Sequence, residues 1–521
     1  MKYKCKTAIT SLALALCALT GNAHASEVKL VAKPVTQFDW IYDDHDTGAD
    51  GDISIWRPNL SHARFNDGNY YSLGDVAMSS HGTAPKMAIA VKAVAADTLA
   101  PPTGYVKVWD DSGSGGSHDV IFWKPVAPAG YTCLGDVAIR SYSQSPDTNW
   151  IRCVKTEYLR SGGYHKVWDD SGSGADDDAG VWQATPANGD EAGLAVNTFI
   201  SRGSHNVGDQ QFFVLDKQKL PGMGFNQQPS SDADWAALAK SFAPLVYLHQ
   251  DDEFLPSSVP YFTPNTSPFS GYNGNITDSN GYLTTPLSCA ICTNQAFLYG
   301  QNPESASVPV YASIITKNSP TVTTGGIEPT DTVTDIVYWM FYPYNRGKWI
   351  NPILWDTTYY GNHVGDWEHL TVRFVNGYPY QVYLSQHGDG STYMFGDKNL
   401  MLTGTSTGEF GAQVYSAKGS HALYAFAGSY TYQSINIVVD SIDLTDHTSQ
   451  GKAWHTSNNV EVMLYQTPGQ YTGNFAWMNY TGRWGNSEQA CISTIGVCRL
   501  EDGPTGPIRK NALNPGYFNL D

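Results

Sequence analysis

Short stretches in which apolar and polar residues alternate run through the second half of the chain and predict β-strands. A strand shows this period of two because successive side chains point to opposite faces of its sheet. The stretches are separated by Gly, Pro, Asn and Ser, and convincing helical patterns are few. The pattern predicts a β-sandwich over residues 243–521. Its main strands are 246–250, 309–315, 334–344, 369–374, 380–387 and 412–417.

The first two hundred residues contain three similar segments, which begin at Trp40, Val108 and Val167. Each runs from an aromatic residue through a turn of Asp, Gly and Ser to a strand that ends in Trp. A repeat of about sixty residues is too long for a solenoid and fits one antiparallel sheet. Three such sheets predict a pseudo-threefold, β-prism-like domain over residues 26–215 that resembles lectin-like modules. The expected fold class is therefore all-β.

The repeated tryptophans and the acidic loops each allow two interpretations. Trp56, Trp123 and Trp182 occupy equivalent places, and each sheet must bury one face, which favours core packing over a sugar-stacking role. The Asp-rich loops are typical of tight turns, where Gly supplies positive φ and Asp accepts hydrogen bonds from nearby backbone. Calcium or glycan binding at the loop tips is the alternative for these loops.

A segment rich in Gly, Pro, Gln and Ser, residues 216–242, separates the two predicted domains. This composition is typical of a linker. Its last part, residues 230–242, predicts a short helix with Ser231 or Asp232 as the N-cap.

The amino-terminal residues predict export. Three lysines precede an apolar stretch, and small residues around position 25 form a cleavage site, so residues 1–25 are expected to be a signal peptide removed near Ala25. The protein is then extracellular or periplasmic. Losing the three lysines moves the net charge from -18 to about -21. This acidity makes nucleic acid an unexpected partner, and no later segment is long and apolar enough for a transmembrane helix.

The six cysteines outside the signal peptide form three local pairs, and disulfides are their default interpretation in an exported protein. The second pair, spaced CxxC, could also serve redox chemistry or half a zinc site, but no second CxxC exists. The pairs are Cys133 with Cys153, Cys289 with Cys292, and Cys491 with Cys498.

The nine residues 361–369, GNHVGDWEH, hold the densest charge between the apolar strands. In a strand, Asp366 and Glu368 share a face with the apolar positions 370, 372 and 374. Two adjacent carboxylates at the end of a buried stripe repel each other, so they must be protonated, paired with a cation or bound to a metal. His363 can turn towards the same point. These three residues predict an oxygen-rich site for Mg²⁺, Ca²⁺ or Mn²⁺.

The alternative interpretation of the two acids involves no metal. Arg373, Arg346 or buried tyrosine hydroxyls would then neutralise Asp366 and Glu368. A metal titration separates the two interpretations.

Further histidines stand at the ends of neighbouring strands. His387 closes the strand 380–387, and His421 opens the segment that follows residues 412–417. A single histidine usually serves as a hydrogen-bonding group, but several at strand ends indicate a shared cleft. If the protein is a metal-dependent hydrolase, His387 or His421 is the candidate general base or stabiliser of developing charge.

Five ordered motifs resemble the vacuolar protein sorting-associated protein 62 family and cover about residues 240–490. The family has no settled biochemical activity, so the resemblance predicts a relationship but no reaction. The motifs are APLVYLHQDDEFLPSSVPYF, TDIVYWMFYPYN, GNHVGDWEHLTVRF, YLSQHGDG and VYSAKGSHALYA.

The stretch NHVGDWE is also similar to the heptapeptide of necrosis-inducing-protein family toxins. That resemblance implies a β-sandwich that binds a divalent cation through His363, Asp366 and Glu368. Val364 and Gly365 replace an Arg-His pair of the family's heptapeptide, and an upstream aspartate ligand falls near Asn345, which can ligate through its carbonyl without adding charge. Those toxins bind glycolipid head groups and lyse membranes.

Two functions follow from the sequence. The first is a secreted protein whose lectin-like module and metal-binding sandwich bind glycans or glycolipids at a cell surface, with membrane-surface association and a cytolytic action as its strongest form. The second is a metal-dependent hydrolase of phosphodiester or glycosidic bonds. We favour binding over catalysis because no catalytic motif demands turnover. A glycosidase using Asp366 and Glu368 alone is disfavoured, because carboxylates two positions apart do not flank a bond.

Overall fold

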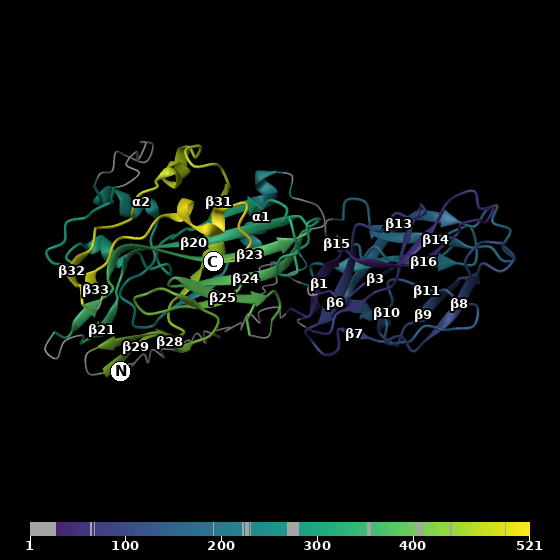
Figure 1. Cartoon of the computed structure of the whole chain (residues 1–521), viewed down its shortest axis with the longest axis horizontal. Helices are drawn as coiled ribbons and strands as arrows, with labels where there is room; N and C mark the ends of the chain where they lie inside the picture. The colour runs from purple at the N-terminus through teal and green to yellow at the C-terminus, as the bar shows by residue number, and fades with distance from the viewer. Residues whose placement is uncertain are drawn as a thin grey trace, which may run out of the picture.

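The computed structural model describes residues 28–62, 65–66, 68–190, 192–220, 223, 229, 231–267, 281–351, 356–397, 399–403, 410–437, 440–494 and 496–520. The expected signal peptide, residues 1–25, lies outside them. Figure 1 shows two neighbouring lobes, with the amino-terminal strands in purple and blue on the right and the later strands in green and yellow on the left. Strands dominate both lobes, which confirms the all-β fold class.

Each of the three repeats contributes one three-stranded antiparallel unit with the same connectivity. Two strands form a hairpin, and a third strand pairs with the hairpin's second strand. The units are β2 (Phe38–Asp43), β3 (Ser54–Pro58) and β5 (Val76–Met78); β8 (Gly104–Asp110), β9 (Ile121–Val126) and β11 (Val137–Ile139); and β13 (Leu159–Asp169), β14 (Gly180–Pro186) and β16 (Phe199–Arg202).

Shorter strands complete the amino-terminal lobe. They form the sheets β1-β6-β4 and β10-β12-β7, while β15 and β17 extend the sheet of β13. Their bounds are β1 Leu30–Val35, β4 Tyr71–Ser72, β6 Ala88–Ala93, β7 Leu99–Ala100, β10 Tyr131–Thr132, β12 Cys153–Lys155, β15 Gly193–Leu194 and β17 Phe213–Asp216.

A ring of three backbone hydrogen bonds joins the repeats. The N–H of Asp75 donates to the carbonyl of Asp136 at 2.9 Å, and the N–H of Asp136 donates to the carbonyl of Phe199 at 2.8 Å. The N–H of Phe199 donates back to Asp75 at 2.9 Å. Each repeat therefore gives one bond and receives one, as a pseudo-threefold arrangement requires.

The acidic loops carry the turn chemistry expected from their composition. Asp44, Asp111 and Asp170 each use Oδ1 to accept the backbone N–H nine residues further on, at 3.0, 2.9 and 2.7 Å. The same side-chain bond in every repeat ties the start of the loop to the start of the next strand.

The core beneath the repeats uses the aromatic residue that directly precedes the two adjacent aspartates of each repeat. Tyr42, Trp109 and Trp168 are 1–4% exposed and pack in one cluster. Of the later tryptophans, Trp182 is buried and confirms core packing, whereas Trp56 and Trp123 are half-buried. Trp123 still packs against the buried cluster of Val137, Ile139 and Ile151. A register shift occurs at the same place in the first strand of each hairpin, directly before Tyr42, Trp109 or Trp168. Each shift changes which side chains of that strand face the core.

We expect the buried carboxyl of Asp136 to make the protein less stable as the pH rises from about 4 to about 6. Burial raises its pKa from 3.8 to about 6, and the hydrogen bonds from the Ser201 N–H and hydroxyl only partly oppose this. The folded state therefore keeps the proton that the unfolded state loses in this range. The stability is present below pH 4 and lost above pH 6.

Urea unfolding of wild type and Asp136→Asn at several pH values measures this effect. The asparagine can still accept both Ser201 bonds and does not titrate, so it should gain up to about 3 kcal/mol relative to wild type between pH 4 and pH 7. A constant difference between the two proteins would show that Asp136 does not carry the pH dependence.

A segment that includes α1 (Asp232–Ser241) connects the lobes. The hydroxyl of Ser231 accepts the Asp234 N–H at 3.2 Å, and the Asp234 carboxylate accepts the Ser231 N–H at 3.0 Å. This capping box starts the helix at the expected place and identifies Ser231 as the N-cap. No sheet of the described chain combines strands from both sides of α1.

The large sheet of the second lobe has the strand order β25-β24-β23-β20-β19-β31. Its two central strands are antiparallel, with Asn345 opposite His363 and Tyr342 opposite Asp366. The predicted charged cluster thus lies at one end of the central strand pair. The bounds are β19 Val310–Thr316, β20 Val333–Asn345, β23 His363–Val375, β24 Tyr378–Gln386, β25 Asp389–Met394 and β31 Val460–Leu464.

A smaller sheet, β27-β26-β18-β30, shares a hydrophobic cluster with the large one. The cluster joins Val246 and Trp454 of the small sheet to Met340, Leu370 and Leu384 of the large sheet. An aromatic cluster covers the other face, with α2 (Val259–Phe262) and Trp484 among its members. The small strands are β18 Leu245–Leu248, β26 Gln413–Ser416, β27 Leu423–Tyr424 and β30 Ala453–His455.

Three hairpins and three disulfides complete this description. The sulfur atoms of Cys133 and Cys153, Cys289 and Cys292, and Cys491 and Cys498 are bonded, as the local pairing predicted. The hairpins pair β21 (Lys348–Ile350) with β22 (Thr358–Tyr360), β28 (Gly428–Ile437) with β29 (Asp440–Thr448), and β32 (Gln489–Ile492) with β33 (Val497–Leu500).

Candidate functional site

The strand alternation changes at Gly365, next to the charged cluster. Gly365 has a φ of +69°, and Val364 packs in the same aromatic cluster as Trp367. Regular alternation would place positions 364 and 367 on opposite faces. The irregularity therefore brings His363 to the same face as Asp366.

A cavity of about 670 Å³ opens beside this end of β20 and β23. Asn345 and His363 contribute to its wall, while the acids Asp366 and Glu368 are buried, each 6% exposed. The cavity also receives polar and aromatic side chains from the β21, β24, β27 and β28 regions. Those that the site uses below are Lys348, His387, Ser420, Tyr424 and Tyr432.

Two of the predicted ligands have hydrogen bonds that orient their other polar atom. Nδ1 of His363 lies 2.6 Å from the Gly365 carbonyl, so this nitrogen carries the proton and Nε2 keeps its lone pair. Nδ2 of Asn345 donates to the Gly361 carbonyl at 2.9 Å, which leaves Oδ1 as the atom that can bind a cation. A backbone partner on the second ring nitrogen is common for metal-binding histidines.

The two acids have different partners. Oδ2 of Asp366 lies 2.8 Å from Nδ1 of His421, whereas Glu368 accepts a short hydrogen bond from the Ser385 hydroxyl. Burial, and then the charge of Asp366, raises the pKa of Glu368 well above its ordinary value. Burial lowers the pKa of His363, although Asp366 opposes this, so His363 is neutral at physiological pH. Glu368 is thus protonated unless a cation lies beside it.

Neither arginine of the metal-free interpretation pairs with these acids. Arg373 makes two bonds to Asp335, at 2.8 and 2.7 Å, and Arg346 lies 3.8 Å from Glu253. Among the described residues, Asp366 instead has His421 beside it, with Nδ1 of the ring 2.8 Å from Oδ2.

His421 is completely buried, which separates it from the cavity. Its ring stacks on Tyr342 with centroids 3.8 Å apart, and its Nε2 lies 3.1 Å from the Phe254 carbonyl. Its backbone is in the left-handed region, with φ of +59°, a conformation that non-glycine residues adopt at a cost. The geometry makes His421 a residue that holds Asp366 in place.

The sequence analysis missed Asp446, which lies in the middle of the polar residues around the cavity. This fully buried carboxylate accepts bonds from Lys348 at 2.6 Å, Ser420 at 2.5 Å and Tyr424 at 2.8 Å, and lies 2.8 Å from Nε2 of His387. Burial alone would raise its pKa, but the bond from His387 and the charge of Lys348 hold the pKa well below the ordinary value. Its sequence context, a polar strand, carried no signal of burial.

His387 is the predicted histidine that reaches the cavity. Its side chain is 29% exposed, its ring stacks on Tyr432 at 3.7 Å, and its φ is +55°. Both predicted histidines therefore have left-handed backbone and an aspartate partner. A glycine neighbour, present at positions 388 and 419, was the sequence signal for these tight turns.

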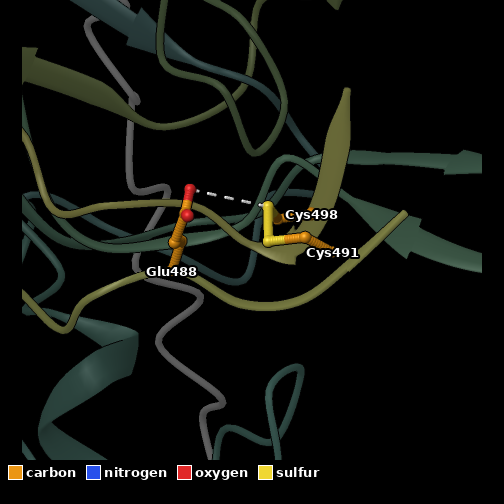
Figure 2. Close-up of side chains that lie close together, drawn as sticks. All are labelled: Glu488, Cys491 and Cys498. Atoms are coloured by element: carbon orange, nitrogen blue, oxygen red, sulfur yellow. Dashed lines mark hydrogen bonds between the residues drawn. A yellow bond between two sulfur atoms is a disulfide. The ribbon is translucent and has the colours of Figure 1, made fainter. Parts of the chain in front are cut away.

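Within the part of the chain that the structure describes, two groups of three His, Cys, Asp or Glu side chains have ligand atoms that all lie within 4.8 Å of one another. Neither group contains the predicted ligands. One comprises Glu488, Cys491 and Cys498, but Figure 2 shows that its sulfurs form a disulfide, so no thiolate is available there. The other lies in the third repeat and comprises Asp170, Asp178 and His205.

The fold and this site define an all-β protein with two lobes and a polar cavity at the end of its central strand pair. The chain matches the sequence profile of the family described as Vacuolar protein sorting-associated protein 62 over residues 15–278 and 325–493. The chain belongs to this family. The match begins well before the motifs that indicated it, so the three repeats are part of the family relationship.

Two curated relatives come from Saccharomyces cerevisiae (strain ATCC 204508 / S288c). Vacuolar protein sorting-associated protein 62 is 32% identical over 34% of this chain and 41% of its own length. Putative vacuolar protein sorting-associated protein TDA6 is 24% identical over 51% of this chain and 65% of its own length. The chain thus spans less than two thirds of either relative.

Among solved structures, the crystal structure of GNIP1Aa from Chromobacterium piscinae is similar to part of this chain. The similarity covers 37% of both chains, with 24% identity and a TM-score of 0.32. Among the described residues, no helix has the length and apolar character needed to span a bilayer.

Proposed function

We propose that this protein is secreted and that its second lobe binds a glycan or glycolipid head group of a target cell surface. The cavity of about 670 Å³ beside β23 carries this proposal. Its size is that of a small-molecule site, and its hydroxyl, imidazole and ammonium groups match a ligand rich in hydroxyl groups. The expected signal peptide and the three disulfides support export.

A divalent cation, Mg²⁺, Ca²⁺ or Mn²⁺, is part of the proposal. His363, Asp366, Glu368 and Asn345 would hold it, and the donor set fits because two buried acids lack an arginine or lysine partner among the described residues. The bound cation would neutralise both acids and offer open positions to oxygen atoms of the ligand. The lectin-like repeats would add a second attachment to the same surface, and association with the membrane surface would follow from it.

We expect Asp366→Asn combined with Glu368→Gln to abolish stoichiometric binding of Mg²⁺, Ca²⁺ or Mn²⁺ at the cavity. Wild type should be stabilised by the ion, by about 2.7 kcal/mol at one hundred times the dissociation constant, and the double variant should not. Without the metal, both proteins should melt at similar temperatures. Elemental analysis and melting curves in EDTA, Ca²⁺, Mg²⁺ and Mn²⁺ measure both effects.

Asp389→Asn is the matched control, because Asp389 is an exposed carboxylate on the wall of the same cavity. It should bind the ion as wild type does. If the double variant keeps its metal, the ligand assignment is wrong. Glycan arrays and liposome leakage with metal-loaded protein then test the ligand and the cytolytic action.

A metal-dependent hydrolase of phosphodiester or glycosidic bonds is the second candidate, and the pair of His387 and Asp446 favours it. Asp446 would hold the imidazole at the cavity wall as a general base. Turnover by metal-loaded wild type that His387→Gln removes would support catalysis. Binding without turnover would leave the first proposal as the function.

A further inference from the structure

We propose a metal site in the third repeat, which binds a divalent transition ion of the zinc class through His205, Asp170 and Asp178. This site is independent of the cavity in the second lobe. Nε2 of His205 lies 2.7 Å from Oδ1 of Asp170 and 3.7 Å from Oδ1 of Asp178. All three ligand atoms lie within 4.8 Å of one another.

The 2.7 Å contact with Asp170 is an ordinary hydrogen-bond distance, whereas the 3.7 Å contact with Asp178 is the separation expected of two ligands of one ion. A separation of 3.7 Å is too long for a hydrogen bond. Ligand atoms that each lie about 2 Å from one zinc ion are about 3–4 Å apart. One imidazolium could also neutralise only one of the two carboxylates, which leaves a negative charge for a cation to meet.

The three ligands come from different segments and differ in the exposure of their side chains. Asp170, at the end of β13, is fixed by the Ala179 N–H at 2.7 Å and is 4% exposed in its side chain. His205, after β16, is 35% exposed, and its Nδ1 lies 3.5 Å from the Ser171 hydroxyl. Asp178, before β14, is 71% exposed. An ion can therefore enter from solvent and keep water in its remaining positions.

The first repeat carries the same residue types at the equivalent place. Nε2 of His81 lies 2.5 Å from Oδ1 of Asp44 and 3.8 Å from Oδ1 of Asp52. In both the first and the third repeat, one histidine thus lies near two aspartates. The turn itself does not require a histidine at this place.

The second repeat departs from this pattern. Tyr142 stands in place of the histidine and hydrogen-bonds to Asp111 and Asp119. A neutral phenol is a poor ligand, and its bonds occupy the carboxylates. The chain thus contains its own comparison, a loop in which the two acids meet a phenol where the other repeats have an imidazole.

The nitrogen ligand decides the class of ion. Imidazole with carboxylates suits Zn²⁺ and similar transition ions, whereas Mg²⁺ and Ca²⁺ prefer oxygen alone. The acidic loop of the third repeat would therefore serve as more than a turn.

The test titrates ZnCl₂ into full-length mature protein, freed of metal with EDTA, in excess Mg²⁺. We expect Asp178→Asn to lose one tightly bound zinc ion per chain, or to bind it at least about tenfold more weakly than wild type. His205→Tyr, which copies the second repeat, should lose the same ion. Calorimetry and elemental analysis count the ions.

Asp119→Asn is the matched control, because it removes the equivalent acid from the repeat in which Tyr142 replaces the histidine, and it should leave zinc binding unchanged. The exposure of Asp178 makes misfolding of its variant an unsatisfactory explanation, and a melting curve in EDTA checks this. Equal zinc binding by wild type and Asp178→Asn overturns the proposal. So does an absence of zinc binding by the double variant Asp366→Asn with Glu368→Gln, which keeps all three ligands of the third repeat. That background separates this site from the cavity site.

Discussion

Arg373→Met is expected to lower the free energy of unfolding by about 3–5 kcal/mol. The guanidinium is 1% exposed and makes two bonds to Asp335, which is equally buried. It also donates to the Phe518 carbonyl at 2.6 Å and so holds the carboxyl-terminal segment to β23. The methionine fills similar space but leaves a buried carboxylate, whose remaining cationic neighbour among the described residues is Lys317 at 3.6 Å. Urea unfolding measures the loss.

The double variant Arg373→Met with Asp335→Leu separates the ion pair from the space that it fills. Removing both charges should restore most of the stability, because the large cost is that of one unpaired buried charge. Burial already lowers the pKa of Lys317 to about 8, so this lysine can lose its proton when Asp335 is gone. If the double variant is as unstable as Arg373→Met, the hydrogen bond to the carboxyl-terminal segment is the larger contribution.

Gly365→Ala is expected to cost about 3 kcal/mol or more and to abolish metal binding at the cavity. An alanine Cβ there would lie 1.9 Å from the Trp484 carbonyl oxygen, so the backbone must move. The φ of +69° adds about 1–2 kcal/mol for any residue with a side chain. Because this glycine turns His363 to the face of Asp366, the shift also moves the ligands. Unfolding curves and calcium titration measure both effects.

Gly361→Ala is the control within the same nine residues. Gly361 also has positive φ, +80°, but its added Cβ would meet its nearest neighbour at 3.9 Å, which is ordinary contact. It should cost only about 1 kcal/mol and leave the metal in place. Equal losses in both variants would mean that backbone conformation alone, and not the contact with Trp484, determines the effect.

The fold was predictable where its signals are local. Turn residues and alternation lie within a few positions of each strand, and three copies of one pattern identified three equivalent sheets. The burial of the tryptophans was not predictable in the same way. A bulge between Trp40 and Tyr42, repeated in the other two hairpins, reverses which residues face the core, and alternation alone does not locate a bulge.

The candidate site was predictable only in part, for the same physical reason. Asp366 and Glu368 share the face of the buried stripe, as alternation required. His363 reaches that face only through the turn at Gly365. Asp446 joins His387 from 59 residues away, through the pairing of β28 with β29 and contacts with other strands. Such long-range placement leaves no pattern in either segment.

The ring of hydrogen bonds between Asp75, Asp136 and Phe199 fixes the number of repeats at three. In an open array, a repeat can be gained or lost at either end, and the remaining interfaces persist. This ring has no terminal repeat. A deleted or duplicated repeat would therefore leave a backbone N–H and a carbonyl of the ring without a hydrogen-bond partner. A change in the number of copies would therefore require a ring of different geometry. Among relatives, change in this lobe is expected in the sequences of the loops, never in the count of the sheets.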